Sequence, residues 1–444
     1  GPCRGNVGSA LTGSGILNYE TTYVRDGVSG DWSKFSGQII ISGNSSGGNV
    51  GFTLANGLPE ASVLMTTDAV MYCEVAGATF PMGSLSGGDS TCQLESTNSG
   101  NGNGAQCIFA VGGLNTSTTY SGGIIDNLNM LKVGTGTWTL NCGGTLLTNT
   151  TIVGITPVTT IGYEANNVYY SGTTTVSNGV LALDAPVTLT NSSTVTLASP
   201  TAELDARDMG YISNLSVVLD NGATQEVIVT STYEVVPGKT LAGIGTLNGN
   251  LQADAGSIFN VGLPTGAFNV TSNASLSGAV TMSLNGGATP SSSELVAPSF
   301  TINSTATLVV TNVGPNITNG VTFTLFNRPV TGFASVTLPS TDSSGPVAYQ
   351  WENDLATDGS ITLTNGGVVV APATPPPITF SLSGTTLKLS WPPAYLGYTL
   401  QAQTNSVATG LSTNWVDVAG SASGTNATIS INPANGTVFY RLVQ

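Results

Sequence analysis

The sequence lacks histidine entirely and has few charged residues of either sign. Asp, Glu, Lys and Arg together make up 7% of the 444 residues, well below the roughly 25% typical of a globular chain. The absence of histidine excludes His-dependent catalytic triads, His metal sites and imidazole pH switches. The surface must instead be kept polar by Ser, Thr, Asn and Gly, residues that favour strands and turns over helices.

Basic residues are the scarcest of the charged groups. The sequence has 9 Lys and Arg against 24 Asp and Glu, which gives a net charge of −15. Binding to nucleic acids or anionic membranes depends on clustered basic residues, so we expect neither partner. Polysaccharide lyases need a base beside the acidic group that they neutralise, and the scatter of these residues argues against that chemistry. They are Lys34, Lys132, Lys239, Lys388, Arg4, Arg25, Arg207, Arg328 and Arg441.

Long hydrophobic runs are also missing. No uninterrupted apolar stretch reaches the roughly 18 residues that a membrane-spanning helix requires, so we expect no membrane span. No signal peptide is visible, and residues 1–3 (Gly-Pro-Cys) are typical of a processed start. We therefore expect a secreted protein, extracellular or on the cell surface, whose leader has been removed.

All the cysteines lie in the first third of the chain. None shows C-x-x-C spacing, which argues against zinc and thioredoxin-type chemistry. An extracellular location would permit disulfides, and one between Cys92 and Cys107 could staple the turn-rich residues 98–104. The odd number leaves one thiol free or paired with another chain, and the alternative is that the cysteines are buried and unpaired. The candidates for disulfides are Cys3, Cys73, Cys92, Cys107 and Cys142.

Short strands separated by turns fill almost every window of the sequence. In residues 173–197, apolar residues alternate with Thr and Ser, which predicts one face inward and one outward. No stretch shows helical periodicity with caps. Parallel strands normally need helical crossovers, but a solenoid winds each strand onto the next coil at about 4.8 Å. We predict an all-β solenoid, and the rival is an antiparallel sandwich, which such dense turn signals also suit.

Three motifs make the prediction more specific. Residues 134–140 read GTGTWTL, residues 170–183 read YSGTTTVSNGVLAL, and residues 241–251 read LAGIGTLNGNL. Together they closely resemble the autotransporter-associated β-strand repeat family of secreted bacterial proteins, over roughly residues 9–260. The resemblance implies a right-handed parallel β-helix in an extracellular setting, without implying one activity. Residues 141–168 interrupt one repeat, which predicts an extra coil or loop there.

The C-terminal part has a different character. Residues 368–378 are rich in proline and predict an extended linker, so we assign residues 1–367 to the β-helix and 379–444 to a small antiparallel, sandwich-like β-domain. That domain contains LSWP, LQAQTN, NWVDV and FYRL in order, and it resembles the C-terminal module of many secreted proteins from Verrucomicrobia-like bacteria. Residues 260–367 are less diagnostic: they either continue the β-helix or form a sandwich.

One acidic group is a candidate for chemistry. On a strand, Glu203, Asp205 and Arg207 share one face, and Asp208 follows them. β-Helix lyases and hydrolases use such acids as calcium ligands or as acid/base pairs. The interpretation that we favour is an outward face carrying an ion pair. We therefore predict no catalytic residue, no cofactor and no metal site.

Aromatic residues offer two further candidates. Trp391 and Trp415 could stack on sugars, but we favour a core role for both because a small domain needs every large apolar group that it has. A polar-aromatic group near the start could form a sugar platform, although turn and core packing is favoured there too. That group comprises Arg25, Asp26, Asp31 and Trp32.

Possible glycosylation sites are numerous but weak as a signal. The triplet Asn-x-Ser/Thr marks a possible N-glycosylation site, but about ten such triplets arise by chance in a chain so rich in Ser and Thr. The candidates are Asn44, Asn115, Asn149, Asn191, Asn214, Asn269, Asn273, Asn303, Asn316, Asn426 and Asn435.

These observations favour a non-catalytic extracellular structural protein. A solenoid exposes unpaired strand edges at both ends, and residues 1–20 show no capping helix, so we expect a neighbouring subunit to cover that end. Head-to-tail contact of this kind builds an open filament. The C-terminal domain or the linker is a candidate for the complementary surface. The alternatives are a carbohydrate-active β-helix enzyme and an adhesin that binds surface polysaccharide.

Overall fold

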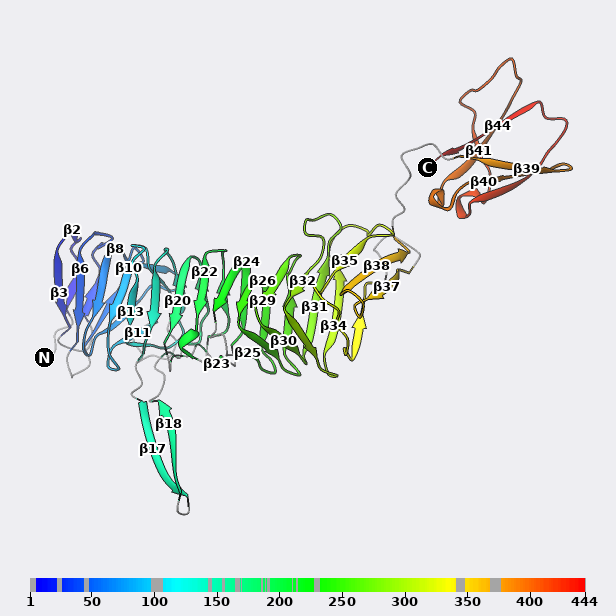
Figure 1. Cartoon of the computed structure of the whole chain (residues 1–444). Helices are drawn as coiled ribbons and strands as arrows, with labels where there is room; N and C mark the ends of the chain where they lie inside the picture. Colours follow the sequence, from blue (N-terminus) through cyan, green and yellow to red (C-terminus); the bar gives the residue numbers. More distant parts are fainter. Residues whose placement is uncertain are drawn as a thin grey trace. The chain divides into compact units, whose positions relative to one another are not determined.

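The structure is a computed structural model, and its elements are almost all short strands (Figure 1). In the part of the chain that it describes, no α-helix occurs. The helical elements there are the 3₁₀ turns η2 (Arg207–Met209), η3 (Pro393–Tyr395) and η4 (Ser421–Ser423), none of which could cross a membrane. The description omits residues 1–4, 22–25, 44–47, 97–106, 143–145, 154–155, 164–167, 169, 185–186, 188, 190–191, 210, 213–214, 227–231, 341–347, 368–376 and 444.

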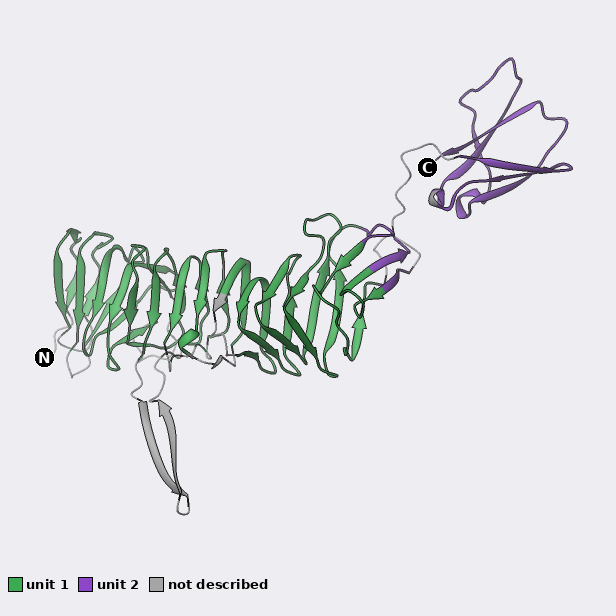
Figure 2. Cartoon of the chain, viewed as in Figure 1, with its two compact units in different colours: residues 1–315, 322–339, 353–361 green, residues 316–321, 340–352, 362–444 purple. Residues whose placement is uncertain are grey.

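The chain divides into two compact units (Figure 2). The first comprises residues 1–315, 322–339 and 353–361, and the second comprises residues 316–321, 340–352 and 362–444. The predicted linker at 368–378 lies largely outside the described residues, so the domain boundaries expected there stay a prediction.

The first unit is a parallel β-solenoid, because the described strands of its successive coils pair in parallel. Its largest sheet is ring-like, since some strands run through a corner of the coil and pair on two faces. The strands of this main sheet are β3 (Ile16–Glu20), β6 (Gln38–Ser42), β8 (Leu58–Met65), β10 (Thr79–Gly87), β12 (Ile108–Val111), β13 (Thr118–Tyr120), β15 (Asn129–Lys132), β16 (Thr137–Leu140), β19 (Thr174–Val176), β20 (Gly179–Leu183), β21 (Val195–Leu197), β22 (Ala202–Asp205), β24 (Val217–Glu226), β26 (Thr240–Asn248), β28 (Ile258–Val261), β29 (Ala267–Val270), β31 (Ala279–Leu284), β32 (Glu294–Val296), β34 (Thr307–Asn312) and β36 (Ser335–Thr337).

Three smaller parallel sheets complete the coils. One contains β1 (Asn6–Val7), β4 (Asp26–Val28), β7 (Asn49–Phe52), β9 (Val70–Cys73), β11 (Gln93–Glu95) and β14 (Gly123–Ile124). A second contains β23 (Tyr211–Ile212), β25 (Thr232–Val235), β27 (Asn250–Ala253), β30 (Asn273–Leu276) and β33 (Ser299–Ile302). The third pairs β2 (Thr12–Gly13) with β5 (Lys34–Phe35). A further sheet has three strands in the order β35 (Thr322–Thr324), β38 (Ser360–Asn365), β37 (Gln350–Asp354).

The core of the solenoid consists of columns of side chains in register. Because parallel strands keep their register from coil to coil, each inward residue stacks on the inward residue of the next coil. One column runs unbroken along the main sheet, and all but its last member are buried. It comprises Phe80, Phe109, Met130, Thr174, Val195, Val217, Leu241, Phe259, Val280, Leu308 and Val336.

The one polar residue of this column, Thr174, has hydrogen-bond partners close by. Thr174 is 1% exposed, and its hydroxyl bonds with the hydroxyls of Tyr170 at 2.5 Å and Ser192 at 3.0 Å. Burying a hydroxyl without a partner would cost a few kcal/mol, so this small network is what permits threonine inside the core.

Hydroxyl groups also link successive coils at their strand ends. The side chains of Ser36, Thr53, Thr66 and Ser86 each donate to a backbone carbonyl one coil earlier, at 3.2–3.3 Å. In this chain with few charged residues, Ser and Thr hydroxyls thus supply hydrogen bonds to the backbone carbonyls of the previous coil.

The corners of the coil depend on glycine. β26 pairs with β28 through Leu241 and with β29 through Gly245, so its backbone turns between the two. Gly243 lies at this turn with φ of +111°, and a Cβ there would lie 1.7 Å from the carbonyl oxygen of Leu219. Only glycine satisfies both constraints.

Coil length varies without disturbing the register. One coil takes 18 residues between Leu241 and Phe259 but 28 between Leu308 and Val336. The predicted insertion at 141–168 contains an antiparallel hairpin, β17 (Leu146–Val153) with β18 (Thr156–Tyr163), so the loop alternative is right and the extra coil is wrong. The coil resumes beyond it, since Trp138 pairs with Leu181.

As far as Thr337, the less diagnostic residues continue the solenoid rather than forming a sandwich. Strands β28, β31, β34 and β36 pair in parallel as far as Thr337. The predicted fold class, an all-β parallel solenoid followed by a small antiparallel β-module, is therefore confirmed.

That antiparallel module consists of two three-stranded sheets. The first is ordered β39 (Thr379–Ser383), β40 (Thr386–Ser390), β43 (Asn426–Ser430), and the second is ordered β42 (Val416–Asp417), β41 (Thr399–Asn405), β44 (Thr437–Val443). They enclose a small core of Leu389, Trp391, Tyr395, Leu400 and Ala427. Trp391 is 4% exposed, which confirms its expected core role.

One lysine lies inside the solenoid. Lys132 is 2% exposed, and its ammonium group donates to the carbonyl oxygens of Val133 at 2.7 Å, Gly134 at 2.8 Å and Asn178 at 3.1 Å. All three ammonium donors are thus used, two within its own turn and one in the next coil. Burial lowers the pKa of Lys132 to about 8.

We predict that Lys132→Met lowers the free energy of unfolding by about 2–4 kcal/mol, because methionine fills the space but leaves three carbonyls without their donor. Guanidinium chloride unfolding measures this. The matched control is Lys34→Met, whose side chain is 72% exposed and lies 3.6 Å from Glu60. That exposed pair contributes little, so we expect a change below about 0.5 kcal/mol. Equal stability of the two variants would contradict the prediction.

Candidate functional site

The acidic group on the solenoid forms an ion pair. Glu203 and Asp205 lie half-buried on β22 and alternate with the buried Leu204, so both acids are on the outer face. The guanidinium of Arg207 donates to Asp205 through Nε at 2.9 Å and through Nη2. These bonds lower the pKa of Asp205. The arrangement agrees with the favoured interpretation, an outward ion pair.

A further acid approaches this ion pair. Asp184 follows β20, and its pKa is raised by burial and then by the charge and hydrogen bonding of Asp208. Sequence reasoning missed Asp184 because it lies about one coil away along the chain. Among the described residues, no three His, Cys, Asp or Glu side chains lie close enough together to hold a metal ion.

The N-terminal polar-aromatic group is part of the core and its turns. Trp32 is 4% exposed and packs edge-on against Tyr19 and Phe52, at 6.0 and 5.9 Å between ring centroids. Its indole N–H donates to the carbonyl of Ser9 at 3.1 Å. The carboxylate of Asp31 accepts from the backbone N–H of Ser33 at 3.0 Å, and that of Asp26 accepts from Gly5 at 3.2 Å. Arg25 lies outside the described residues.

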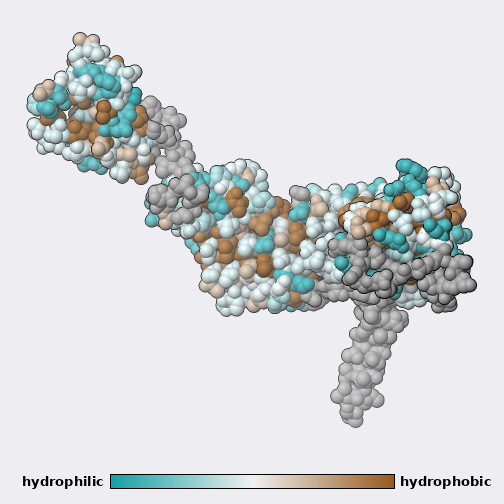
Figure 3. Space-filling model, turned by 180° about the vertical axis from the view of Figure 1, so that it is seen from behind, coloured by the Kyte–Doolittle hydropathy of each residue, from teal (hydrophilic) through white to brown (hydrophobic). Residues whose placement is uncertain are grey.

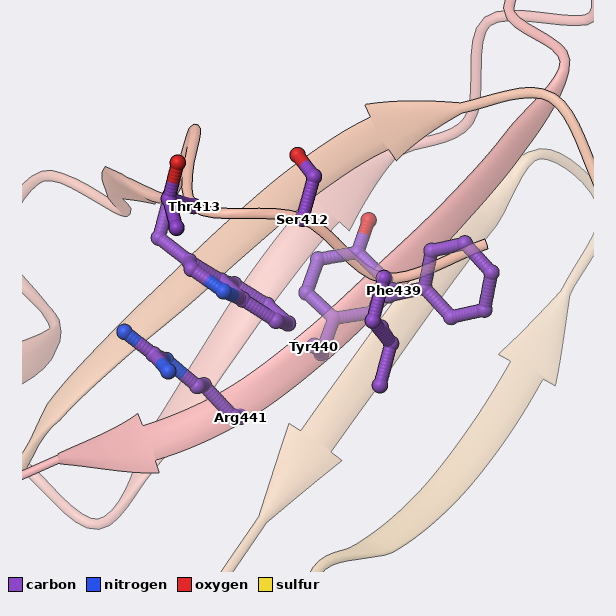
Figure 4. A pocket seen from close by; sticks show the side chains of 7 residues that line it. Ser412, Thr413, Phe439, Tyr440 and Arg441 are labelled. Carbon is purple, nitrogen blue, oxygen red and sulfur yellow. The ribbon is translucent and has the colours of Figure 1, made fainter. Parts of the chain in front are cut away.

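The expected core role of Trp415 is wrong. Trp415 is half-buried just before β42 and does not belong to the module's core cluster; it lines a surface pocket of about 590 Å³ (Figure 4). The loop before β42 contributes one wall, and β44 contributes the other. The lining residues are Leu411, Ser412, Thr413, Trp415, Phe439, Tyr440 and Arg441.

A row of polar side chains crosses the sheet beside this pocket. Asp417 on β42, Gln401 on β41 and Arg441 on β44 are in register. The amide nitrogen of Gln401 donates to Asp417 at 2.7 Å, and its amide oxygen accepts from Arg441 at 3.0 and 2.8 Å. The sheet register therefore fixes the position of the guanidinium.

The guanidinium in turn fixes the indole. The central carbon of Arg441 lies 4.3 Å from the ring centroid of Trp415, which is a cation–π contact. In Figure 4, Arg441 and Tyr440 project from β44, and Ser412 and Thr413 lie on the loop that faces this strand. Burial raises the pKa of Tyr440, so its phenol stays protonated near neutral pH. The pocket thus combines aromatic faces with hydroxyl groups and one fixed cation.

A second pocket of about 410 Å³ lies on the solenoid. It is lined largely by small and hydroxyl-bearing residues around Glu294 of β32, whose pKa is raised by burial. Among its lining residues Glu294 is the sole carboxylate, whereas glycoside hydrolysis uses two. This pocket therefore does not offer the pair of acids that the enzyme alternative needs.

The glycosylation candidates differ in accessibility. Asn115, Asn303, Asn426 and Asn435 are exposed, whereas Asn269, Asn273 and Asn316 are half-buried. Asn303 already donates its amide to the hydroxyl of Ser277 at 2.8 Å. Asn44, Asn191 and Asn214 lie outside the described residues, and so does the side chain of Asn149.

The expected staple between Cys92 and Cys107 does not form. The four described cysteines are buried free thiols, and Cys3 lies outside the described residues. Cys92 donates to the carbonyl of Thr66 at 2.6 Å, whereas Cys107 donates to that of Ser96 at 3.6 Å and its neighbouring thiol is that of Cys73. Coil stacking brings together residues that are distant in sequence, so flanking a common loop does not pair them.

Comparison with known proteins leaves the family open. No protein-family model matches the chain, and no curated protein is similar enough to match it. The resemblance to autotransporter-associated β-strand repeats therefore stays a prediction from the motifs.

We predict that the two tryptophans of the module differ sharply in stabilising it. Trp391→Ala should lower its stability by about 3–5 kcal/mol because it empties the core. Trp415→Ala should cost about 1 kcal/mol or less, the size of an exposed cation–π contact. Hydrogen exchange of backbone amides in β41 and β44 of the full chain resolves this locally. Similar losses for both variants would show that Trp415 is a core residue after all.

Proposed function

We propose that this chain is a non-catalytic extracellular structural protein whose solenoids associate head to tail. The supporting observation is that the inward-facing residues of the edge strands β3, β33 and β36 are only half-buried, while their register partners in the adjacent coils are fully buried. At the first coil, Leu17 and Tyr19 are half-buried, whereas their register partners Ile39 and Ile41 are 0% and 1% exposed.

The other end of the solenoid repeats this pattern. Phe300 and Ile302 on β33 are half-buried, whereas their partners Ala274 and Leu276 are 0% exposed. Val336 on β36 is half-buried as well. A further coil stacked on either end would remove these apolar side chains from water, which contributes about 25 cal/mol per Å².

Among the described residues, the edge strands β3 and β36 also each have one side without a neighbouring strand. β3 pairs only with β6: Gly15 accepts from Gln38, and Thr21 donates to Ser42. Since alternate residues of a strand bond to opposite sides, residues 16, 18 and 20 direct their N–H and C=O groups to the free edge. By the same alternation, Ala334 donates to Ala306, so Ser335 faces the free edge of β36.

Pairing the last coil of one copy with the first coil of another would continue the sheets in the same parallel direction. The surfaces differ, so the contact is heterologous and generates an open filament. Figure 3 shows the visible face of the solenoid as a mixture of hydrophilic, intermediate and hydrophobic residues. Charged residues make up only 7% of the whole chain, which limits repulsion between copies. The net charge of −15 still favours solubility of single subunits.

We predict that the purified chain forms filaments and that Asn18→Pro or Ser335→Pro prevents them. Each proline removes an outward N–H at one end without removing a bond to the neighbouring strand. Sedimentation velocity across a range of concentrations and electron microscopy measure assembly. The controls Asn18→Thr and Ser335→Thr keep the N–H groups and should assemble as the wild type does.

Mixing the two proline variants gives the sharper test. Each retains one competent end, so the mixture should form dimers but nothing longer, while each variant alone stays monomeric. Circular dichroism and melting temperature verify that both variants fold. A wild type that is monomeric at every concentration, or proline variants that polymerise normally, would refute head-to-tail assembly.

The Trp415 pocket favours a second function, the binding of neutral polysaccharide. Aromatic faces suit the C–H faces of sugar rings, while Ser412, Thr413 and Arg441 offer polar groups to sugar hydroxyls. The negative charge of the chain disfavours acidic polymers. A stalk that carries such a module would act as an adhesin.

We predict that the full chain binds a soluble neutral oligosaccharide such as cellohexaose or xylohexaose, and that Trp415→Ala weakens the binding at least about tenfold. Isothermal titration calorimetry measures this. Phe380→Ala is the matched control, because Phe380 is an aromatic residue of the same module that is 76% exposed and does not line the pocket. Absence of binding to both sugars, or equal affinity of the Trp415→Ala variant, would count against this function.

A further inference from the structure

Two cysteines from successive coils meet inside the solenoid. Cys73 ends β9, and Cys107 immediately precedes β12. Both are 0% exposed. They are 34 positions apart in the sequence, and nothing in their spacing marks them as partners.

The sheet register explains how they meet. β9 pairs with β11 so that Tyr72 lies opposite Glu95, which places Ser96 opposite Cys73. The sulfur of Cys107 lies 3.6 Å from the carbonyl oxygen of Ser96, and it therefore reaches the residue stacked on Cys73. The thiol of Cys73 is close enough to that of Cys107 for each to shift the pKa of the other.

The reciprocal pKa shifts of the pair agree with this placement. Contact with the Cys107 thiol lowers the pKa of Cys73 to about 7, while contact with Cys73 and then burial raise the pKa of Cys107. Shifts of this kind require the two thiols to lie side by side in the folded chain.

The other two described cysteines lack this geometry. Gly123 donates its N–H to the carbonyl of Cys92, and Cys142 donates its thiol to the carbonyl of Gly122 at 2.7 Å. Cys92 and Cys142 therefore lie on either side of one intervening coil, about 9.6 Å apart at two strand spacings. A disulfide needs Cα atoms within about 7 Å, so these two cannot be joined.

We propose that Cys73 and Cys107 form a disulfide that joins two successive coils when the chain folds in an oxidising environment. The oxidant is a small-molecule or protein disulfide. The Cys73 thiolate attacks it and releases one thiol, and Cys107 then displaces the second thiol as the new sulfur–sulfur bond forms. Two thiols of the chain are oxidised, and one external disulfide is reduced to two thiols. Because the site is buried, this exchange takes place before the solenoid closes.

The test compares full chain refolded in a mixture of reduced and oxidised glutathione with chain refolded in a reductant. Under denaturing conditions, thiol titration should show two fewer free thiols in the oxidised sample. Mass spectrometry of peptic fragments without reduction should identify one cross-link, between the segments containing Cys73 and Cys107. The oxidised sample should also melt about 5–10 °C higher, because the link restricts the unfolded chain.

Serine variants provide the matched controls. Cys73→Ser and Cys107→Ser should abolish both the cross-link and the melting difference, whereas Cys92→Ser and Cys142→Ser should keep them. The comparison of oxidised and reduced wild type stands even if a variant fails to fold. A cross-link from Cys107 to Cys92 or Cys3, or a natively folded oxidised sample with all thiols free, would overturn the proposal.

Discussion

The structure depends on one constraint: the parallel backbone hydrogen bonds that hold each strand one spacing from its counterpart in the next coil. These bonds keep the register constant, so Phe80 stacks on Phe109 and Leu241 stacks on Phe259. They also impose limits, because a corner such as Gly243 leaves no room for a side chain. Buried polar groups persist only where the register supplies partners, as it does for Thr174 and the ammonium of Lys132.

The same constraint explains why the ends of the solenoid differ from its middle. An inner coil is covered on both sides, but a terminal coil is less covered on one side, and there Leu17 and Val336 stay half-buried. A coil added at either end would make the same kind of contact as the coils within the chain, because each interface between coils resembles the others. Head-to-tail association is therefore an extension of the contact that folds the chain, and this is the physical basis of the proposed structural role.

The antiparallel module follows different rules. Its sheets are short, and its core is small, so a large side chain beside it can remain on the surface. Cross-strand register aligns Asp417, Gln401 and Arg441, and the last of these holds the indole of Trp415 at 4.3 Å. Aromatic and cationic groups thus gather here, whereas the guanidinium of Arg207 on the solenoid is paired with Asp205.

Composition and alternation by themselves determined that the chain is all-β, because strands of period two with glycine corners leave no room for helices. They left a parallel solenoid and an antiparallel sandwich as rivals, and the parallel pairing of successive coils decided between them. They also favoured a core role for Trp391 and an ion pair for Asp205, since both follow from local pattern. Only the tertiary structure decided that Trp415 lines a pocket, that Lys132 is buried, and that Cys107 meets Cys73 rather than Cys92. Those contacts depend on how many residues each coil takes, which varies from coil to coil and leaves no periodic trace in the sequence.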